Sequence, residues 1–381
     1  MPKASLTEDS RAATRAFEQW LGQHLSLLEP DLELKHEQMA QSVSAFLRAT
    51  FYRFMQRWFA SAGDLARAPL VLAVGDLHME NFGTWRDAEG RLVWGINDFD
   101  EAYALPYTLD LLRLVVSAGA ARRDGNLKIS LEDAAQAVLT GYQAGLNAGG
   151  KPFVLEEQNS WLRELTGKSK DPVRFWAKLT ALTPLERPIS TVSPVLEQVL
   201  RDALPDGATV RFAHRVAGLG SLGRVRVVAL TEWQGGWMAR EAKALAPSAV
   251  VWAASHLKSG LEKTGPLYYA DLLARAVRSP DPTVHIVEQT GQILGPSGQS
   301  YVVRRLSPSS RRLNLLDLPR GCDEAQLLEA MGFETANIHL GTPDRVSAIQ
   351  ADLKARAKGW LLEGASKLLE GTLEDWRVWK G

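Results

Sequence analysis

Three short polar side chains stand near the ends of strand-like segments in the first third of the chain. Asp76 and Asn81 follow the apolar run 70–74, and Asp98 follows the run 91–97. Phosphoryl transfer needs such a set, in which one carboxylate orients the attacking hydroxyl while an amide oxygen and a second carboxylate hold Mg²⁺. The pattern predicts that Asp76 orients the hydroxyl or accepts its proton, and that Asn81 and Asp98 are magnesium ligands.

A glycine-rich segment much later in the chain could complete this site. Gly218-Leu-Gly220-Ser221-Leu-Gly223 precedes the run 224–230, which is typical of a strand, whereas a dinucleotide-binding loop must open a helix. A glycine turn between two strands can lie over ATP phosphates, because a Cβ would keep its backbone N–H groups at a distance. We expect these glycines and the serine to bind ATP, with an ordinary tight turn as the alternative.

The next strand-like run supplies a candidate cation for the same phosphates. It ends in Arg240-Glu-Ala-Lys243, where Lys243 is the first choice and Arg240 the second, and the two point to opposite faces of a strand. Exposed charges on an edge strand are the alternative. Glu288 is a candidate for the acid that orients the cation, and a solvated glutamate is again the alternative.

Together these motifs resemble the aminoglycoside and choline phosphotransferase branch of protein-kinase-like folds. The segment 75–81 is similar to that branch's His-Gly-Asp-x-His-x-x-Asn loop, with Val74 in place of the first histidine, and the segment 98–100 is similar to its metal-binding motif. The resemblance implies ATP and Mg²⁺ as cofactors and a catalytic role for Asp76.

The resemblance also implies roles for residues around these motifs. Asp100 would contact a second metal ion or a substrate amine. His78 would support the loop through a hydrogen bond. Asp110, early in an apolar helix, would brace the catalytic loop through backbone N–H groups.

A longer succession of motifs, over most of residues 40–310, is similar to domain of unknown function 2252, a bacterial family. In that family we expect Lys-Glu-Ala on the third strand of the sheet, where this chain has Arg240-Glu-Ala followed by Lys243. The departure leaves the identity of the phosphate-binding cation open between these two residues.

The order of the motifs predicts an α+β fold with unusual connectivity. An ordinary kinase places its glycine loop and cation before the catalytic loop, whereas here they follow it. We infer a circularly permuted, two-lobed, protein-kinase-like fold: a helical part with the catalytic hairpin over 1–205, an inserted antiparallel β-rich part over 206–306, and a hinge with further helices over 307–381. Permutation is permissible when the original termini lie close together.

Hydrophobic periodicity places the elements within these parts. Within the helical stretch 8–62, a long helix over 36–62 is expected to feed the catalytic loop, and residues 300–320 are expected to carry the hinge. Further helices are predicted at 106–121, 131–146, 155–165, 172–182, 192–203, 247–260, 267–277 and from 322 onward. Strands are predicted at 70–75, 82–86 and 91–97, as a three-stranded antiparallel sheet within 209–243, and at 300–306.

The acceptor is expected to be small. Only twelve residue steps separate Asp98 from Asp110, which leaves no room for the long activation segment and peptide platform of a protein kinase. We therefore expect a small hydroxyl- or amine-bearing acceptor, bound by the helices between 120 and 205.

The composition is typical of a globular protein and limits the kinds of binding partner that we expect. The 381 residues carry 44 Lys plus Arg against 44 Asp plus Glu, without the basic excess of a nucleic-acid-binding protein. Cys322 is the only cysteine, which suits a reducing cytoplasm, and no apolar run predicts a membrane span. We expect a cytoplasmic protein without nucleic-acid or membrane partners.

Three other functions stay open at this point. Asp76-x-His78 after a strand also resembles the first ligands of a binuclear metallophosphoesterase, although the Gly-Asn-His and Gly-His-x-His settings of the other ligands are not found. Arg240 in the expected lysine position would suit a nucleotide-binding pseudokinase or scaffold. Transfer of AMP instead of phosphate would use the same Mg·ATP and similar acids.

Overall fold

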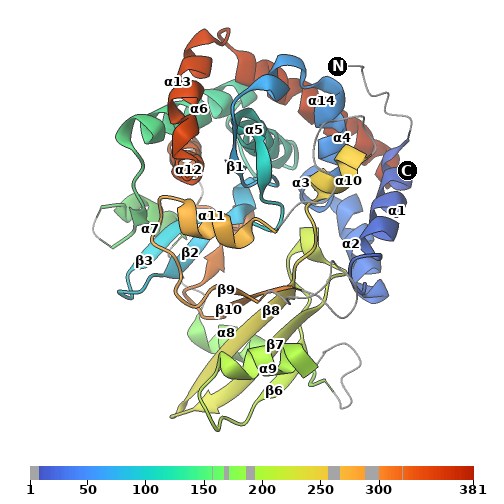
Figure 1. The fold of residues 1–381 in the computed structure, drawn as a ribbon, viewed down its shortest axis with the longest axis vertical. Coiled ribbons are helices and arrows are strands. Elements are labelled where there is room, and N and C mark those ends of the chain that lie inside the picture. The colour runs from blue at the N-terminus through green and yellow to red at the C-terminus, as the bar shows by residue number, and fades with distance from the viewer. Residues whose placement is uncertain are drawn as a thin grey trace.

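The computed structural model describes residues 8–156, 158–166, 171–185, 194–255, 267–287, 300–319 and 321–381. Within these ranges the fold is α+β, and Figure 1 shows most of the helices at one end of the molecule and the larger sheet, with α8 and α9, at the other. None of the helices in these ranges has the length and apolar character needed to cross a membrane.

Helices and strands alternate irregularly along the chain. The helices are α1 (Ser10–Leu21), α2 (Glu29–Gln41), α3 (Val43–Ala49), α4 (Phe51–Ser61), α5 (Tyr107–Arg123), α6 (Leu131–Ala148), α7 (Ser160–Thr166), α8 (Pro172–Thr180), α9 (Pro194–Asp202), α10 (Ala249–Ser255), α11 (Tyr269–Arg275), α12 (Glu324–His339), α13 (Val346–Ala355) and α14 (Trp360–Lys380). The strands are β1 (Leu70–Ala73), β2 (Phe82–Arg86), β3 (Leu92–Ile96), β4 (Tyr103–Pro106), β5 (Phe153–Val154), β6 (Arg211–His214), β7 (Arg226–Trp233), β8 (Gly236–Ala244), β9 (His285–Val287), β10 (Tyr301–Arg305) and β11 (Arg311–Arg312).

The single long helix expected over 36–62 is replaced by three shorter helices, so that prediction is wrong. Ser42 has extended backbone angles (φ −153°, ψ 160°), and its Oγ accepts a hydrogen bond of 3.1 Å from the Ala45 N–H, so α3 begins there. A second break at Thr50 separates α3 from α4. Serine favours helix starts because its hydroxyl satisfies a free backbone N–H, a preference that apolar spacing alone does not register.

The core of the helical part is built around α5, in which every residue from 107 to 121 is buried. Nearby, α6 and α12 pack closely through glycines. A Cβ on Gly141 or on Gly332 would lie 1.8 or 2.1 Å from a backbone carbonyl oxygen of the partner helix. Only glycine therefore allows this approach of the two helices.

The larger sheet has the strand order β6-β7-β8-β10-β9, with every neighbouring pair antiparallel. β7 and β8 form the expected hairpin, whose turn residues Gln234 and Gly235 have φ of +48° and +82°. Two consecutive positive φ angles are what a two-residue type I′ turn requires. The segment 300–306 contributes β10 as expected, while the short strand β9 has no counterpart in the prediction.

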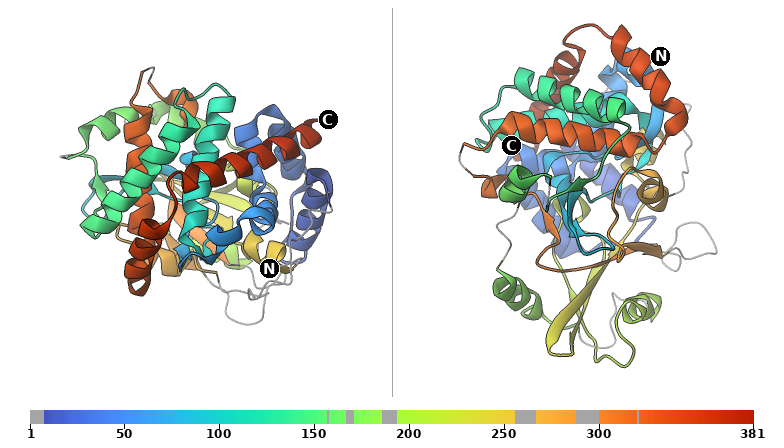
Figure 2. Two further views of the ribbon diagram at one scale, coloured as in Figure 1. Left: turned by 90° about the horizontal axis from the view of Figure 1, so that it is seen from above. Right: turned by 90° about the vertical axis from the view of Figure 1, so that its left-hand side faces the viewer.

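Three helices pack against a different part of the molecule from the one to which the predicted domain boundaries assign them. α8 and α9 lie on opposite faces of the larger sheet (Figure 2). They pack on it through Leu179 and Leu200, although the first predicted boundary assigns both helices to the helical part. α10 follows the sheet strands, yet its Trp252 contacts Phe17 and Tyr52, with ring centroids 5.4 and 5.9 Å away. The two parts are therefore interleaved along the sequence.

Two small sheets position the motif residues. β1 pairs with β4, and the predicted hairpin β2–β3 is flanked by β11 and β5. β11 lies within the segment expected to be the hinge, and its pairing with β2 attaches this connection to the catalytic hairpin. β4, β5 and β11 have only two to four residues each, which is too short for a strand's alternation to show in the sequence.

The first and last helices lie side by side, as Figure 1 shows. Ser10 Oγ donates a hydrogen bond of 2.8 Å to the Asp375 carbonyl, and Arg11 Nη2 donates one of 2.9 Å to the Trp379 carbonyl. The Asp375 carboxylate also accepts two hydrogen bonds from Arg53 of α4. These contacts fasten α1 and α14 to one another and to the helical core.

Candidate functional site

The catalytic-loop motif follows β1 and is shaped by its backbone contacts. Gly75 has φ +82°, and a Cβ there would lie 2.4 Å from the Glu101 carbonyl oxygen, so only glycine fits. The Asp110 carboxylate accepts hydrogen bonds from the N–H groups of Val74 (2.8 Å) and Gly75 (2.9 Å). His339 Nε2, 3.0 Å from the same carboxylate, holds it from the other side. Asp110 therefore occupies the bracing position that the resemblance implies.

Asp76 is paired with Arg113, a fully buried arginine of α5. The Asp76 Oδ1 accepts hydrogen bonds from Arg113 Nε (3.0 Å) and Nη2 (2.5 Å). The rings of Phe51 and Phe54 lie 5.5 and 4.5 Å from the guanidinium carbon, which adds a cation–π attraction. Burial raises the pKa of Asp76 to about 7, although the Arg113 charge lowers it. Asp76 can therefore exchange a proton near neutral pH.

Hydrogen bonds bring the two motif loops together. The Asn81 carbonyl accepts a hydrogen bond of 3.0 Å from the Asn97 N–H, and Asn81 Nδ2 donates one of 2.9 Å to the Asp76 carbonyl. The second bond fixes the orientation of the amide. Asn81 and Asp98 line the same cavity.

Asp98 and Asp100 are paired with cations from distant parts of the chain. Lys243 Nζ lies 3.1 Å from Asp98 Oδ1 and 2.6 Å from Asp100 Oδ1. Arg312 also donates to Asp98, and Arg224 Nη1 lies 3.5 Å from Asp100. Burial would raise the pKa of Asp98, but the Lys243 and Arg312 charges outweigh burial and hold that pKa well below its usual range. Burial and the neighbouring Asp98 charge raise the pKa of Asp100.

The glycine turn joins β6 to β7 and lies directly over Asp76. It contains a single 3₁₀ turn at Leu219–Ser221 and then enters a strand, as expected for a strand–turn–strand motif. A Cβ on Gly220 would lie 2.9 Å from the Arg48 carbonyl oxygen and 3.9 Å from Asp76 Oδ2. The two leucines of the turn are buried against α2 and α3, so apolar packing holds the turn above the catalytic loop.

The other residues of the turn have different surroundings. Gly218 (φ +76°) and Ser221 line the small cavity, whereas a Cβ on Gly223 (φ +93°) would lie 2.4 Å from Leu32 Cδ2. The Ser221 Oγ accepts a hydrogen bond of 2.8 Å from Arg226 Nη2. Gly223 thus lets the turn approach α2, and the segment 218–221 faces the cavity.

The two candidate cations lie on opposite faces of β8. Lys243 reaches Asp98, whereas Arg240 Nη1 donates a hydrogen bond of 3.1 Å to the carbonyl of Ala239 beside it. The geometry therefore favours Lys243 as the cation of this site. Glu288, the candidate acid partner, lies outside the described residues.

His78 is buried in the catalytic loop. Burial and the nearby charges of Arg48 and Arg113 hold its pKa well below the usual value, so the imidazole is neutral at pH 7. Its Nδ1 is buried without a hydrogen-bond partner among the described residues, while its backbone carbonyl accepts a hydrogen bond of 2.9 Å from the Asn81 N–H. The support that His78 gives the loop here thus comes from its backbone.

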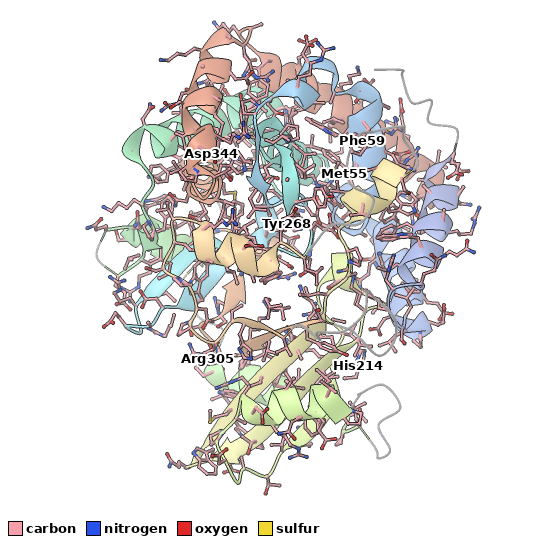
Figure 3. The ribbon with its side chains drawn as sticks, in the orientation of Figure 1. Met55, Phe59, His214, Tyr268, Arg305 and Asp344 are labelled. Atoms are coloured by element: carbon pink, nitrogen blue, oxygen red, sulfur yellow. The ribbon has the colours of Figure 1, made fainter. Side chains whose placement is uncertain are left out.

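Two adjoining cavities surround these groups. The smaller, of about 50 Å³, is lined by the glycine turn and by the motif carboxylates and amide. The larger, of about 650 Å³, is a cleft between the helical part and the larger sheet, and Arg305, labelled in Figure 3, lines it from β10. Arg48, Gly218 and Arg312 line both cavities, so the two meet at these residues.

Lys243 is the only one of the described cations paired with the motif carboxylates to which the sequence prediction gives a role. Arg113, Arg224 and Arg312 come from three distant segments, and their pairing with aspartates depends on the tertiary fold. Of these three, only Arg113 carries a local signal, because it is a charged residue in an apolar stretch of α5, three residues after Asp110.

The donor set suits a magnesium ion better than a binuclear centre. The ranges described above contain no group of three or more His, Cys, Asp or Glu side chains placed to hold a metal ion, so a binuclear metallophosphoesterase site finds no support in them. Mg²⁺ is commonly held by one or two carboxylates together with substrate phosphates. Asn81 and Asp98 fit that simpler requirement.

The comparison with known proteins gives a family match over part of the chain. Residues 28–174 match a family model described as an uncharacterized protein conserved in bacteria (DUF2252). The match includes both motif loops and Asp110, and it ends before the glycine turn and Lys243. No curated protein and no solved structure matches the chain.

Proposed function

We propose that this protein is a Mg²⁺- and ATP-dependent phosphotransferase with a circularly permuted, kinase-like arrangement of two lobes. The observation that carries the proposal is that the catalytic-loop motif and the glycine turn, far apart in the sequence, line one small cavity. Lys243 of the larger sheet also contacts Asp98 there. Phosphate-holding backbone and a cation beside metal-binding oxygens are the parts that phosphoryl transfer requires.

Each residue has a distinct role in this proposal. Asp76 accepts the proton of the acceptor group, and Arg113 fixes the orientation of its carboxylate. The backbone N–H groups of residues 218–220 bind phosphate oxygens, while the Ser221 N–H closes the turn by a hydrogen bond of 3.0 Å to the Gly218 carbonyl. Bound Mg²⁺, held by Asn81 and Asp98, would neutralise charge on the β- and γ-phosphates.

The contacts of Lys243 fit a phosphate-binding cation. Lys243 and Arg312 both contact Asp98, so a triphosphate bound here would exchange those contacts for its own oxygens. The Asp98 carboxylate would then be available to the metal ion. Lys243 is therefore expected to move from a carboxylate partner to a phosphate partner when Mg·ATP binds.

The acceptor in this proposal is a small hydroxyl- or amine-bearing molecule. The short segment between Asp98 and Asp110 forms β4 and enters α5 directly, which leaves no platform for a protein substrate. Leu165, Thr166 and Phe175, from the region expected to bind the acceptor, line the larger cleft. The cleft can therefore admit an acceptor beside the triphosphate.

Thermal unfolding with Mg·ATP tests the nucleotide site. Ligand at a hundred times its Kd should stabilise the protein by about 2.7 kcal/mol. Asp98→Asn should lose the Mg²⁺-dependent part of the shift, since it removes the negative charge of the metal ligand. Asp76→Asn should keep the shift but lose turnover, measured as ADP release in the presence of candidate acceptors. Asp344→Asn, at an exposed position, is the control.

Two outcomes would count against the proposal. If Mg·ATP produces no shift in the unmodified protein, nucleotide binding is ruled out. If Asp98→Asn keeps the full Mg²⁺-dependent shift, the metal ion is held elsewhere.

Lys243→Ala and Arg240→Ala should differ, with only the first weakening ATP binding.

A further inference from the structure

The larger cleft is strongly basic for a protein with no net charge. Among the described residues that line it, eight are arginines and three are acidic. The chain as a whole has equal numbers of basic and acidic residues, so positive charge is concentrated here. Such a cleft would attract anionic ligands and disfavour a polycationic acceptor.

Three of these arginines converge on a single carboxylate. Glu241 of β8 has no exposed surface, and its Oε1 accepts hydrogen bonds of 2.8 Å from Arg226 Nη1 and from Arg304 Nη2. Its Oε2 accepts a hydrogen bond from Arg215 Nη1. Burial would raise the pKa of Glu241, but the three arginines hold it well below its usual range, so the carboxylate is ionised.

The cluster keeps an excess of positive charge. One carboxylate against three guanidinium groups leaves two charges uncompensated within the cluster. The Arg215 and Arg304 side chains retain 27% and 22% of their surface, and all three arginines line the cleft. A salt bridge that served only to join two strands would need one arginine for the Glu241 carboxylate. The carboxylate instead fixes several guanidinium groups toward one space, which is the arrangement that recognises phosphate.

The cluster continues the row of phosphate-binding groups in the catalytic site. Glu241 precedes Lys243 by two residues on the same face of β8, a separation of about 7 Å along a strand. Arg226 lies opposite Lys243 in the strand register and donates to Ser221 of the glycine turn. An anion bound at the cluster would therefore lie next to the glycine turn.

We propose that Arg215, Arg226 and Arg304, held around Glu241, form a second phosphate-binding site that takes a multiply charged phosphate group in the larger cleft. The group could belong to the nucleotide's own phosphate chain or to a phosphorylated acceptor. The assignment of its source rests on the proposed function, whereas the site itself rests on the cluster's geometry.

Calorimetric titration with inorganic tripolyphosphate, without magnesium, tests the site directly. The unmodified protein should bind tripolyphosphate, and Arg215→Gln and Arg304→Gln should each weaken binding about tenfold, because each removes one charge-assisted contact. Arg275→Gln removes an equal charge from an exposed position on α11 and should leave binding unchanged. Arg215 is the most exposed member of the cluster, so its variant keeps the test valid if the Arg304 variant does not fold.

Competition with Mg·ATP separates the two sources of phosphate. If saturating Mg·ATP excludes tripolyphosphate, the cluster binds the nucleotide's own phosphates. If both bind together, it binds a phosphorylated acceptor. Absence of tripolyphosphate binding, or equal binding by the Arg215, Arg304 and Arg275 variants, overturns the site. Tripolyphosphate binding without Mg·ATP binding would instead keep the site and reject the proposed function.

Discussion

At the scale of single residues, the pairing of Asp76 with Arg113 influences the pKa of the Asp76 carboxylate. Burial raises the pKa of Asp76 to about 7, and Arg113 opposes this rise through two hydrogen bonds to Oδ1. A carboxylate with a pKa near neutrality is well suited to proton transfer. The ionised form, which accepts the proton, becomes dominant above pH 7.

The pH dependence of turnover should follow from this pair. In the proposed mechanism Asp76 acts in its ionised form, so the value of kcat/KM should rise with pH up to about 7 and then level off. Arg113→Gln should move the rising limb to higher pH, because Arg113 lowers the pKa of Asp76. A profile that is flat from pH 5 to 8, or an unmoved limb in the variant, would contradict this role.

Asp110 illustrates a different residue role, which is structural. Its carboxylate is fully buried and accepts the Val74 and Gly75 N–H groups. Asp110→Ala should lower the free energy of unfolding by about 3 kcal/mol, since two buried donors would lose their acceptor. Chemical denaturation would measure the loss. Asp344→Ala, at an exposed site, should change stability little, and equal effects of the two variants would contradict the bracing role.

Residue-scale prediction from sequence succeeds where a motif is local. Asp76, Asn81 and Asp98 are brought to one cavity by loops whose spacing is visible in the sequence. The cations that pair with these acids come from distant segments, and no spacing rule predicts such contacts. The sequence ranked Lys243 before Arg240, and strand β8 shows that Lys243 is the one that faces Asp98.

At the scale of elements, the glycine turn is defined by its distance from the catalytic loop. Gly220→Ala should weaken Mg·ATP binding about tenfold, because its Cβ would lie 2.9 Å from the Arg48 carbonyl oxygen and push the turn away from Asp76. The matched variant Gly236→Ala, in the β7–β8 hairpin with open surroundings, should leave binding unchanged. Thermal shifts with Mg·ATP would compare the two, and equal affinities would show that the turn's position is unimportant for ATP.

How accurately a helix or strand is predicted from the sequence depends on its length and on the residues that cap it. Helix α5 and hairpin β2–β3 were predicted nearly to the residue, since each has a clear apolar pattern and a clear end. The breaks at Ser42 and Thr50 and the short strands β4, β5 and β9 were not predicted. In these cases a single hydroxyl or a tertiary pairing decides the local structure, and neither changes the apolar periodicity.

At the scale of the whole molecule, contacts between distant segments hold the helical part and the larger sheet together. Lys243 reaches Asp98 and Asp100, and His214 of β6, labelled in Figure 3, lies 3.0 Å from Asp31 of α2. α10 returns from the sheet to the helical core. The sequence predicted two parts, yet it could not show that both contribute to one packed core.

Because α1 and α14 are neighbours, the two ends of the described chain could be joined and the chain opened elsewhere without changing the fold. A gene that links Gly381 to Glu8 through a flexible bridge, and opens the backbone at Gly207, would preserve every described strand pairing. The ribosome would then make the glycine turn before the catalytic loop, as in ordinary kinases. Such a rearranged protein should melt at the same temperature and respond equally to Mg·ATP. Failure to fold would mean that this order of synthesis matters to the architecture.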